Sequence, residues 1–453
     1  MQLLIYTTGI SSRLTYVCST LLQTLRIESY LVTSDLILYN KSSGAKINYS
    51  AQRINESEIW IESSSLLFET GIRQQQIACF DYKNQKAFFA TSGDIPFDIF
   101  AASFFLLSRY EEYLPHQKDV YGRYSHENSV AFREGFLQLP VINLWVKELS
   151  ILLSAKWPAL TLNTSKFAFL PTYDIDIAYS YRSKGLMRNM GGFLRSILSG
   201  EWSPVVERMN VLFNKTKDPF DSYEWLHQLH RTYRLKPLYF FLFAGKNKAF
   251  DKNILPGKKA LRKLVEQHSN QYELGIHPSW QSADSPELLK SELANLQRVS
   301  GKSITKSRHH YIRTELPKSY RALIEAGILE DYSMGYGSIN GFRSSYCLPH
   351  FWYDLQNEQT TALRIFPFCF MDANSYYEQR YNSDEALNEI KHYVRVTKQV
   401  QGLLITIWHN HLLGNDKMFY GWKEVYEAAV KDITGNTWDE SPGNTGNENT
   451  FMD

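Results

Sequence analysis

The sequence predicts an α/β protein: a main domain built on a parallel sheet, preceded by a smaller N-terminal α/β domain. Five short apolar runs in the last two-thirds of the chain each come just before a polar cluster. Segments with helical spacing of apolar residues lie between most of these runs, which is the alternation typical of parallel sheets. The composition, 43% hydrophobic and 21% charged over 453 residues, is that of a globular protein.

The first domain is expected to span residues 1–155. Residues 3–6 predict a strand, and an amphipathic helix follows with Ser11 or Ser12 as its N-cap. A helix at 96–113 ends in Ser-Arg-Tyr-Glu-Glu-Tyr, whose charged residues are interpreted as a solvated or salt-bridged helix end. The remaining expected elements are strands at 37–39, 59–61 and 87–91 and a helix at 141–152.

The main domain is expected to span residues 165–432. Residues 185–217 are basic and are interpreted as an insertion over the site face, with helices at 194–198 and 205–213. Residues 434–453 are polar and rich in Gly and Asn, which predicts a disordered tail. The expected strands lie at 167–170, 238–243, 272–276, just before 305, 363–370 and 403–408, and the expected helices at 261–267, 286–299, 317–326 and 386–400.

Charge and composition exclude several classes of protein. The net charge of +2, from 49 basic and 47 acidic residues, gives no reason to expect nucleic acid or an anionic membrane as partner. No apolar run approaches the roughly 20 residues of a membrane span, and we expect a cytoplasmic protein. The four cysteines form no CxxC pair, which predicts buried free thiols. The aromatic content of 14% fits sugar stacking, although an aromatic core is the favoured interpretation.

The most informative cluster is Tyr173-Asp-Ile-Asp, at the end of the first strand of the main domain. Side chains alternate along an extended segment, so Asp174 and Asp176 should point to the same side. One carboxylate could bind a cation while the other acts as a base. The alternative is a pair of turn or capping aspartates.

Histidines end three other expected strands. His277 follows one run, Arg308-His309-His310 another, and His409-Asn-His the last. Because the carboxyl ends of parallel strands meet at one edge, these groups should converge there. Histidine titrates near neutral pH and can protonate a leaving group. Asp331 and Asp372 are two further candidate carboxylates, and the alternative for each is a turn residue.

Together these residues resemble the polysaccharide deacetylase superfamily, the NodB-like domain of carbohydrate esterase family 4, over about residues 167–428. The resemblance implies a distorted (β/α) barrel. Thr172-Tyr-Asp-Ile-Asp is similar to the first family motif, which implies Asp174 as catalytic base and Asp176 as metal ligand. Glu273-Leu-Gly-Ile-His-Pro-Ser is similar to the second and implies His277 as ligand. Ser307-Arg-His-His-Tyr and Ile407-Trp-His are similar to later motifs, implying that Arg308 orients the base and His409 is the general acid.

A bacterial subgroup of this family is also similar outside those motifs. Its N-terminal domain carries the same Ser-Arg-Tyr-Glu-Glu-Tyr stretch, and its later segments resemble Asp331-Tyr-Ser-Met-Gly-Tyr and Gly341-Phe-Arg. With the resemblance we expect a carbohydrate as substrate and Trp408 near its acetyl group. The other expected substrate contacts are Tyr173, Ser279 and Arg343.

One departure from the family concerns the metal. A second histidine usually stands four residues after the first in the second motif, and here that place is Gln281. Catalytic zinc normally has three protein ligands, and we expect His310 to be the third. The cation expected is zinc, with cobalt or nickel as alternatives.

The predicted reaction is removal of N-acetyl or O-acetyl groups from a sugar or polysaccharide. One alternative is a non-catalytic carbohydrate-binding or assembly protein that has lost its metal. Another is a metal-free glycoside hydrolase, which needs two carboxylates about 5–10 Å apart across a sugar cleft. The sequence gives no indication of oligomeric state.

Overall fold

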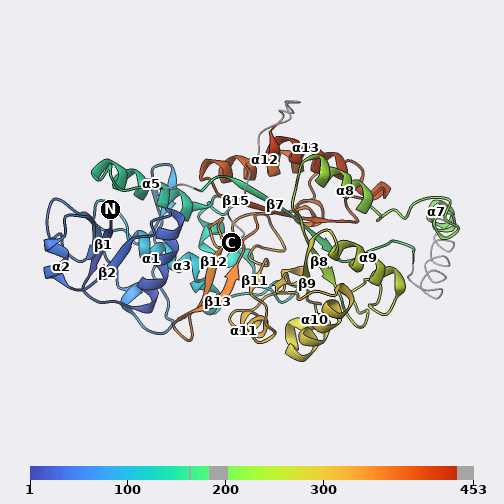
Figure 1. Cartoon of the computed structure of the whole chain (residues 1–453), viewed down its shortest axis with the longest axis horizontal. Coiled ribbons are helices and arrows are strands. Elements are labelled where there is room, and N and C mark those ends of the chain that lie inside the picture. Colours follow the sequence, from blue (N-terminus) through green and yellow to red (C-terminus); the bar gives the residue numbers. More distant parts are fainter. Residues whose placement is uncertain (163–164, 183–201, 436–453) are drawn as a thin grey trace. The chain divides into compact units, whose positions relative to one another are not determined.

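The computed structural model describes residues 1–162, 165–182 and 202–435 (Figure 1). The expected helix at 194–198 and nearly all of the expected tail at 434–453 lie outside these residues. The chain forms two compact units. Unit 1 comprises Met1–Phe167, Thr305–Cys369 and Val396–Gly402, and unit 2 comprises Ala168–Ile304, Phe370–Arg395 and Leu403–Asp453.

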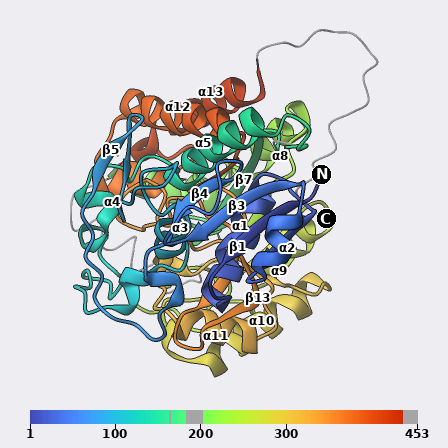
Figure 2. The same cartoon turned by 90° about the vertical axis from the view of Figure 1, so that its left-hand side faces the viewer.

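Unit 1 begins with a four-stranded parallel sheet in the order β2-β1-β3-β4 (Figure 2). Helix α1, Ser12–Thr24, starts where the Ser11 side chain accepts a hydrogen bond from the Leu14 N–H, so the predicted N-cap is confirmed. The strands are β1 (Leu3–Thr7), β2 (Tyr30–Thr33), β3 (Ala45–Ser50) and β4 (Ile59–Glu62), and the long helix is α5 (Val141–Lys156).

Three local expectations in this region were wrong. Residues 37–39 form helix α2, Leu36–Lys41, because the Asp35 side chain accepts from the N–H groups of Ile37 and Leu38 and starts a helix. The helix expected at 96–113 is interrupted at Arg109, whose φ of 54° is left-handed, and splits into α3 (Ile99–Leu107) and η2 (Tyr110–Tyr113). The strand expected at 87–91 ends at Ala87, as β6 (Gln85–Ala87) of a hairpin with β5 (Phe80–Tyr82).

Ion pairs of buried arginines join the N-terminal residues of unit 1 to its later segment. Arg13 is 1% exposed, and its Nε lies 2.9 Å from Glu358 Oε2. Glu112 pairs with Arg343 in the same way, at 2.6 Å and 2.8 Å. The later segment contains β10 (Lys306–Ser307), β11 (Glu330–Asp331) and β13 (Gln359–Ile365), which are parallel, β12 (His350–Asp354), which is antiparallel to β13, and α11 (Lys318–Glu325).

Unit 2 is built on a parallel sheet in the order β9-β8-β7-β15-β14 (Figure 1). Residues on these strands are almost all buried, as in parallel sheets covered on both faces. The strands are β7 (Ala168–Ile175), β8 (Leu238–Leu242), β9 (Glu273–His277), β14 (Phe370–Met371) and β15 (Leu403–His409). The helices are α7 (Trp202–Leu212), α8 (Tyr223–Thr232), α9 (Lys259–Ser269), α10 (Pro286–Ser300), α12 (Ser383–Gln399) and α13 (Trp422–Thr434).

The architecture is therefore mixed α/β with mostly parallel sheets, as predicted, while closure into a barrel stays a prediction. The run at 363–370 was expected to be one strand, but β13 ends at Ile365 and β14 starts at Phe370. None of the helices in the described parts of the chain has both the length and the apolar character needed to cross a membrane.

Candidate metal and catalytic site

The register of the unit 2 sheet brings acidic and imidazole side chains to one edge. Asp174 on β7 is the direct register partner of His409 on β15. Ile175 pairs with Phe241, and Leu242 pairs with His277, so Asp176 and His277 lie level across β8. Met371 pairs with Ile407, which puts Asp372 next to the end of β15. We call Asp174, Asp176, His277, Asp372 and His409 the carboxylate–imidazole cluster.

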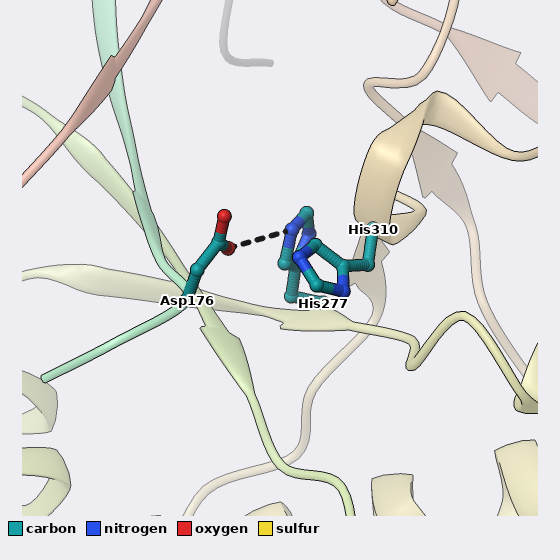
Figure 3. Close-up of side chains that lie close together, drawn as sticks. All are labelled: Asp176, His277 and His310. Atoms are coloured by element: carbon teal, nitrogen blue, oxygen red, sulfur yellow. Dashed lines mark ion pairs between the residues drawn. The ribbon is translucent and has the colours of Figure 1, made fainter. Parts of the chain in front are cut away.

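Asp176 is the centre of this cluster. Its Oδ1 lies 3.1 Å from His277 Nε2 (Figure 3), and its Oδ2 lies 3.4 Å from His409 Nε2. The Oδ2 of Asp174 lies 3.9 Å from the same His277 nitrogen. Asp174 and His277 are each 2% exposed, whereas the Asp176 side chain keeps 16% of its surface accessible. The cluster is therefore nearly buried but open to solvent at Asp176.

The His409 ring is held by Asp372, a fully buried carboxylate. Asp372 Oδ1 lies 2.6 Å from His409 Nδ1, and Oδ2 accepts from the His409 backbone N–H at 2.7 Å. Burial by itself lowers the pKa of His409, but the Asp372 and Asp176 carboxylates outweigh burial and hold that pKa well above its ordinary value. Both ring nitrogens of His409 therefore face carboxylates, Nδ1 toward Asp372 and Nε2 toward Asp176.

The loops that follow β7 and β8 are fixed by one buried amide. Asn253 donates to the carbonyls of Ile175 and Leu242 at 3.1 Å and 2.9 Å, and its oxygen accepts from Ala178 N and Ile254 N. Because Asp176 directly follows Ile175, Asn253 holds the chain at the point where that carboxylate projects. This residue was not identified from the sequence, where an isolated Asn in a loop gives no signal.

Two expected substrate contacts lie apart from the cluster. Side chains alternate along a strand, so Tyr173 and Trp408 face away from Asp174 and His409. The Tyr173 hydroxyl contacts His230 Nε2 at 2.7 Å and also the Tyr426 hydroxyl. Trp408 donates from Nε1 to Thr406 Oγ1, and its ring centroid is 4.5 Å from that of Tyr426.

Ser279 and Gln281 are occupied by other partners. The Ser279 backbone N–H donates to Glu292 Oε2 at 3.0 Å, and the Ser279 hydroxyl accepts from Ser282 N at 3.1 Å. Gln281 donates from its amide to Asp251 Oδ2 at 3.0 Å.

Three further candidates belong to unit 1. Arg308 is fully buried and donates from Nε to the Tyr332 carbonyl at 3.0 Å, with its guanidinium over the Tyr332 and Phe368 rings. His310 is buried in η5 (His310–Ile312). Arg343 is bound to Glu112. The roles expected for Arg308, His310 and Arg343 toward residues of unit 2 stay predictions.

The donor atoms in unit 2 fit a divalent cation such as zinc. Two ligand atoms on a tetrahedral ion at 2.0–2.2 Å lie roughly 3.4 Å apart. The separation between Asp176 Oδ1 and His277 Nε2, 3.1 Å, has about this size. Carboxylate oxygen and imidazole nitrogen are also the ligand types that zinc takes.

The residue whose role was missed is Asp372. The sequence indicated only a further carboxylate or a turn residue and assigned it no role, whereas its carboxylate accepts from His409 Nδ1, His409 N and Ala373 N. The available signal was its position directly after a short apolar run, the same signal that identified Asp174 and His277.

Comparison with known proteins gives one sequence match. The model of a family of unknown function (DUF7033) matches residues 3–158. No curated protein matches the chain.

Solved structures with partial similarity include proteins of one class. A protein from Mycobacterium smegmatis, provisionally assigned as a polysaccharide deacetylase, is 11% identical over 62% of this chain and 87% of its own, with a TM-score of 0.39. A probable polysaccharide deacetylase from Pseudomonas aeruginosa PAO1 is 13% identical over 59% and 85%, at 0.38. The polysaccharide deacetylase Bc1974 from Bacillus cereus is 11% identical over 59% and 88%, at 0.28. At these identities and TM-scores, no conclusion about activity rests on the similarity.

Proposed function

We propose that the protein is a metal-dependent hydrolase that removes acetyl groups from an N-acetylated or O-acetylated sugar or polysaccharide. The observation that carries this proposal is the carboxylate–imidazole cluster at the carboxyl ends of β7, β9, β14 and β15. In this cluster the partly accessible Asp176 carboxylate lies between the His277 and His409 imidazoles. The buried Asp174 carboxylate lies next to His277, and the Asp372 carboxylate binds the other nitrogen of His409. Acyl-group hydrolysis needs these parts: a cation site, a general base and a general acid.

Asp176, His277 and His310 are the proposed ligands of the cation (Figure 3). When bound, a zinc, cobalt or nickel ion would polarise the acyl carbonyl and increase the acidity of a water molecule. Within unit 2, Asp176 and His277 already hold their ligand atoms at a separation suited to a shared ion. His310 is the proposed third ligand because Gln281, at the place of the usual family histidine, donates its amide to Asp251.

Asp174 is the proposed general base, and Arg308 the residue that orients it. The Asp174 carboxylate is buried next to His277 and can accept a proton from an attacking water. His409 is the proposed general acid. Its imidazolium is stabilised by Asp372 at Nδ1, so its Nε2 proton is available to a departing amine or alkoxide.

Several sequence predictions remain part of this proposal. They are the NodB-like barrel, the division into domains at 1–155 and 165–432, the substrate contacts Tyr173, Ser279, Trp408 and Arg343, and the cytoplasmic location. The alternative is a carbohydrate-binding protein without activity, for which the specific observation is Gln281 at the place of a ligand.

The proposal is tested by metal content and acetate release. The purified protein is stripped with a chelator, reloaded with Zn²⁺ or Co²⁺, and assayed with N-acetylated oligosaccharides. We expect near-stoichiometric metal, lost in His277→Ala, and metal-dependent acetate release. Asp174→Asn should keep the metal and lose at least a hundredfold in kcat, since a general base contributes about 10²–10⁴. A folded protein that binds neither cation and releases no acetate would refute the proposal, and sugar binding without metal would favour the alternative.

A further inference from the structure

The loop that carries His310 adopts an unfavourable backbone conformation. Tyr311 has φ 59° and ψ 11°, and Ile312 has φ 54°. The left-handed region is unfavourable for non-glycine residues, and it is rarest for β-branched residues such as Ile. Two in succession persist only if surrounding contacts hold them. The turn therefore needs a partner outside its own residues.

That partner is Arg123, on the N-terminal part of unit 1. The Arg123 side chain is 5% exposed, and its Nη1 donates to the Tyr311 carbonyl at 2.8 Å. Its Nε donates to Asp119 Oδ2 at 2.6 Å, and Asp119 Oδ1 accepts from the Arg123 backbone N–H at 2.9 Å. The planar guanidinium thus bridges a carboxylate of its own segment and the carbonyl of the left-handed residue.

Two features show how closely Arg123 fits against this turn. A Cβ on Gly337 would lie 2.0 Å from Arg123 Nη1 and 2.8 Å from the Tyr311 carbonyl oxygen, so only glycine leaves room. The Tyr121 ring packs against Tyr311 with centroids 5.2 Å apart, and the Arg123 guanidinium lies over Tyr121. The contact is thus enclosed on several sides.

A second buried arginine supports the other end of the same loop. Arg343 donates from Nη1 to Thr314 Oγ1 at 3.3 Å and to the Gly335 carbonyl at 3.1 Å. Arg343 is itself fixed by Glu112, whose Oε1 also accepts from Arg109 Nε at 2.7 Å. Both supports of the loop therefore start from residues 109–123, in the stretch matched by the family of unknown function.

We propose that Arg123 is a positioning residue for His310, and that residues 109–123 act as a rigid support for the metal-binding loop. This inference rests on the proposed function, since His310 matters there as a ligand. It gives residues 109–123, within the stretch matched by the family of unknown function, a physical role. This segment fixes the backbone turn that orients the His310 imidazole, without contacting metal or substrate. Outer residues that orient metal ligands typically contribute 10–100-fold to metal affinity.

The test variant is Arg123→Lys. Lysine keeps the positive charge but has one ammonium group, which cannot match the geometry of Asp119 and Tyr311 together. The matched control is Lys118→Met, because Lys118 comes from the same segment and pairs with Glu315 at 2.7 Å, but both side chains are about half exposed. An exposed ion pair of this kind contributes little to stability, because solvent screens it. If Arg123→Lys does not fold, Asp119→Asn removes the same bridge more mildly.

Two measurements separate this inference from the proposed function. Hydrogen exchange on the metal-free protein follows the amides of Ile312 and Arg313, which bond to the His309 and His310 carbonyls. Zn²⁺ competition and the Co²⁺ absorption spectrum report affinity and ligand geometry. Arg123→Lys should speed exchange at these amides, weaken metal binding 10–100-fold and alter the Co²⁺ spectrum, whereas Lys118→Met should do none of these.

The outcomes differ in what they overturn. Unchanged exchange at Ile312 and Arg313 in Arg123→Lys refutes the support by Arg123, whether or not metal binds. Faster exchange with unchanged metal affinity and Co²⁺ spectrum refutes positioning and leaves only a structural contact. Wild-type protein that binds no metal refutes the proposed function and, with it, the role of Arg123 toward a ligand.

Discussion

The sharpest prediction concerns Asp372→Asn, which changes one atom and one charge in the cluster. The Asp372 carboxylate accepts three N–H groups: His409 Nδ1 at 2.6 Å and Ala373 N at 2.7 Å on Oδ1, and His409 N at 2.7 Å on Oδ2. Asparagine has one acceptor oxygen, so in either orientation its NH₂ group faces at least one buried donor. The lost bond and the unsatisfied donor should cost about 1–3 kcal/mol of stability.

The loss of charge has a separate effect on His409. Burial alone lowers the pKa of this imidazole, and Asp372 is the first of the carboxylates that reverse this effect. The pKa of His409 should therefore fall in the variant. Because the folded-state pKa is raised in wild type, its stabilising contribution is complete below about pH 6.5. This contribution of His409 to the free energy of unfolding is lost as pH rises through the folded-state pKa. The decrease in unfolding free energy over that pH range should be smaller in the variant.

The assay is NMR titration of the His409 ring in the metal-free protein, with urea unfolding at several pH values. Acetate release should fall by at most about 10²–10⁴-fold, the contribution of a general acid, because Asp372 acts through His409. Asp354→Asn is the matched control, since Asp354 is equally buried and binds Arg321 through both oxygens, in unit 1. A His409 pKa that is ordinary in wild type, or unchanged in Asp372→Asn, would refute the reasoning.

Three further predictions follow from buried groups. Glu112→Gln leaves two buried guanidinium groups without their shared carboxylate and should cost about 3–5 kcal/mol in urea unfolding; a loss below 1 kcal/mol would contradict this. Gly337→Ala should displace Arg123 and weaken metal binding as Arg123→Lys does, whereas wild-type affinity would show that the contact is dispensable. Burial lowers the pKa of His230 to about 3 and of His268 to about 4. Stability should therefore be complete above pH 6.5 and fall as pH decreases, by about 2 kcal/mol for each ring at pH 5, and a flat profile of unfolding free energy would refute this.

The parallel sheet of unit 2 was predictable because its strands are short apolar runs ending in polar residues. Asp174, Asp176, His277 and His409 came from that pattern alone, and the register brings all four together. The wrong expectations for local elements have local causes. An aspartate at 35 turned an expected strand into a helix through two hydrogen bonds, a contact that apolar spacing does not encode.

Long-range pairing explains what the sequence left open. The charged Ser-Arg-Tyr-Glu-Glu-Tyr stretch was read as a solvated or salt-bridged helix end, and the ion pairs are present. The stretch is not solvated, however, since Arg109 is 1% exposed. Its partner Glu112 also pairs with Arg343, a residue far along the chain. A sequence pattern relates charges within one segment, so it could not predict that the fold places Arg343 next to Glu112.

The same reasoning changes what Gln281 implies. In the sequence it stands at the place of a ligand in the second motif, so we expected His310 as the third ligand and kept a protein without activity as the alternative. In the structure its amide donates to Asp251, a fully buried carboxylate that also accepts from Trp280 N at 2.9 Å. Gln281 therefore has a structural task of its own, since a buried carboxylate needs its donors. Gln281 is thus held by a structural contact, and the third ligand that we propose is His310 rather than the residue at 281.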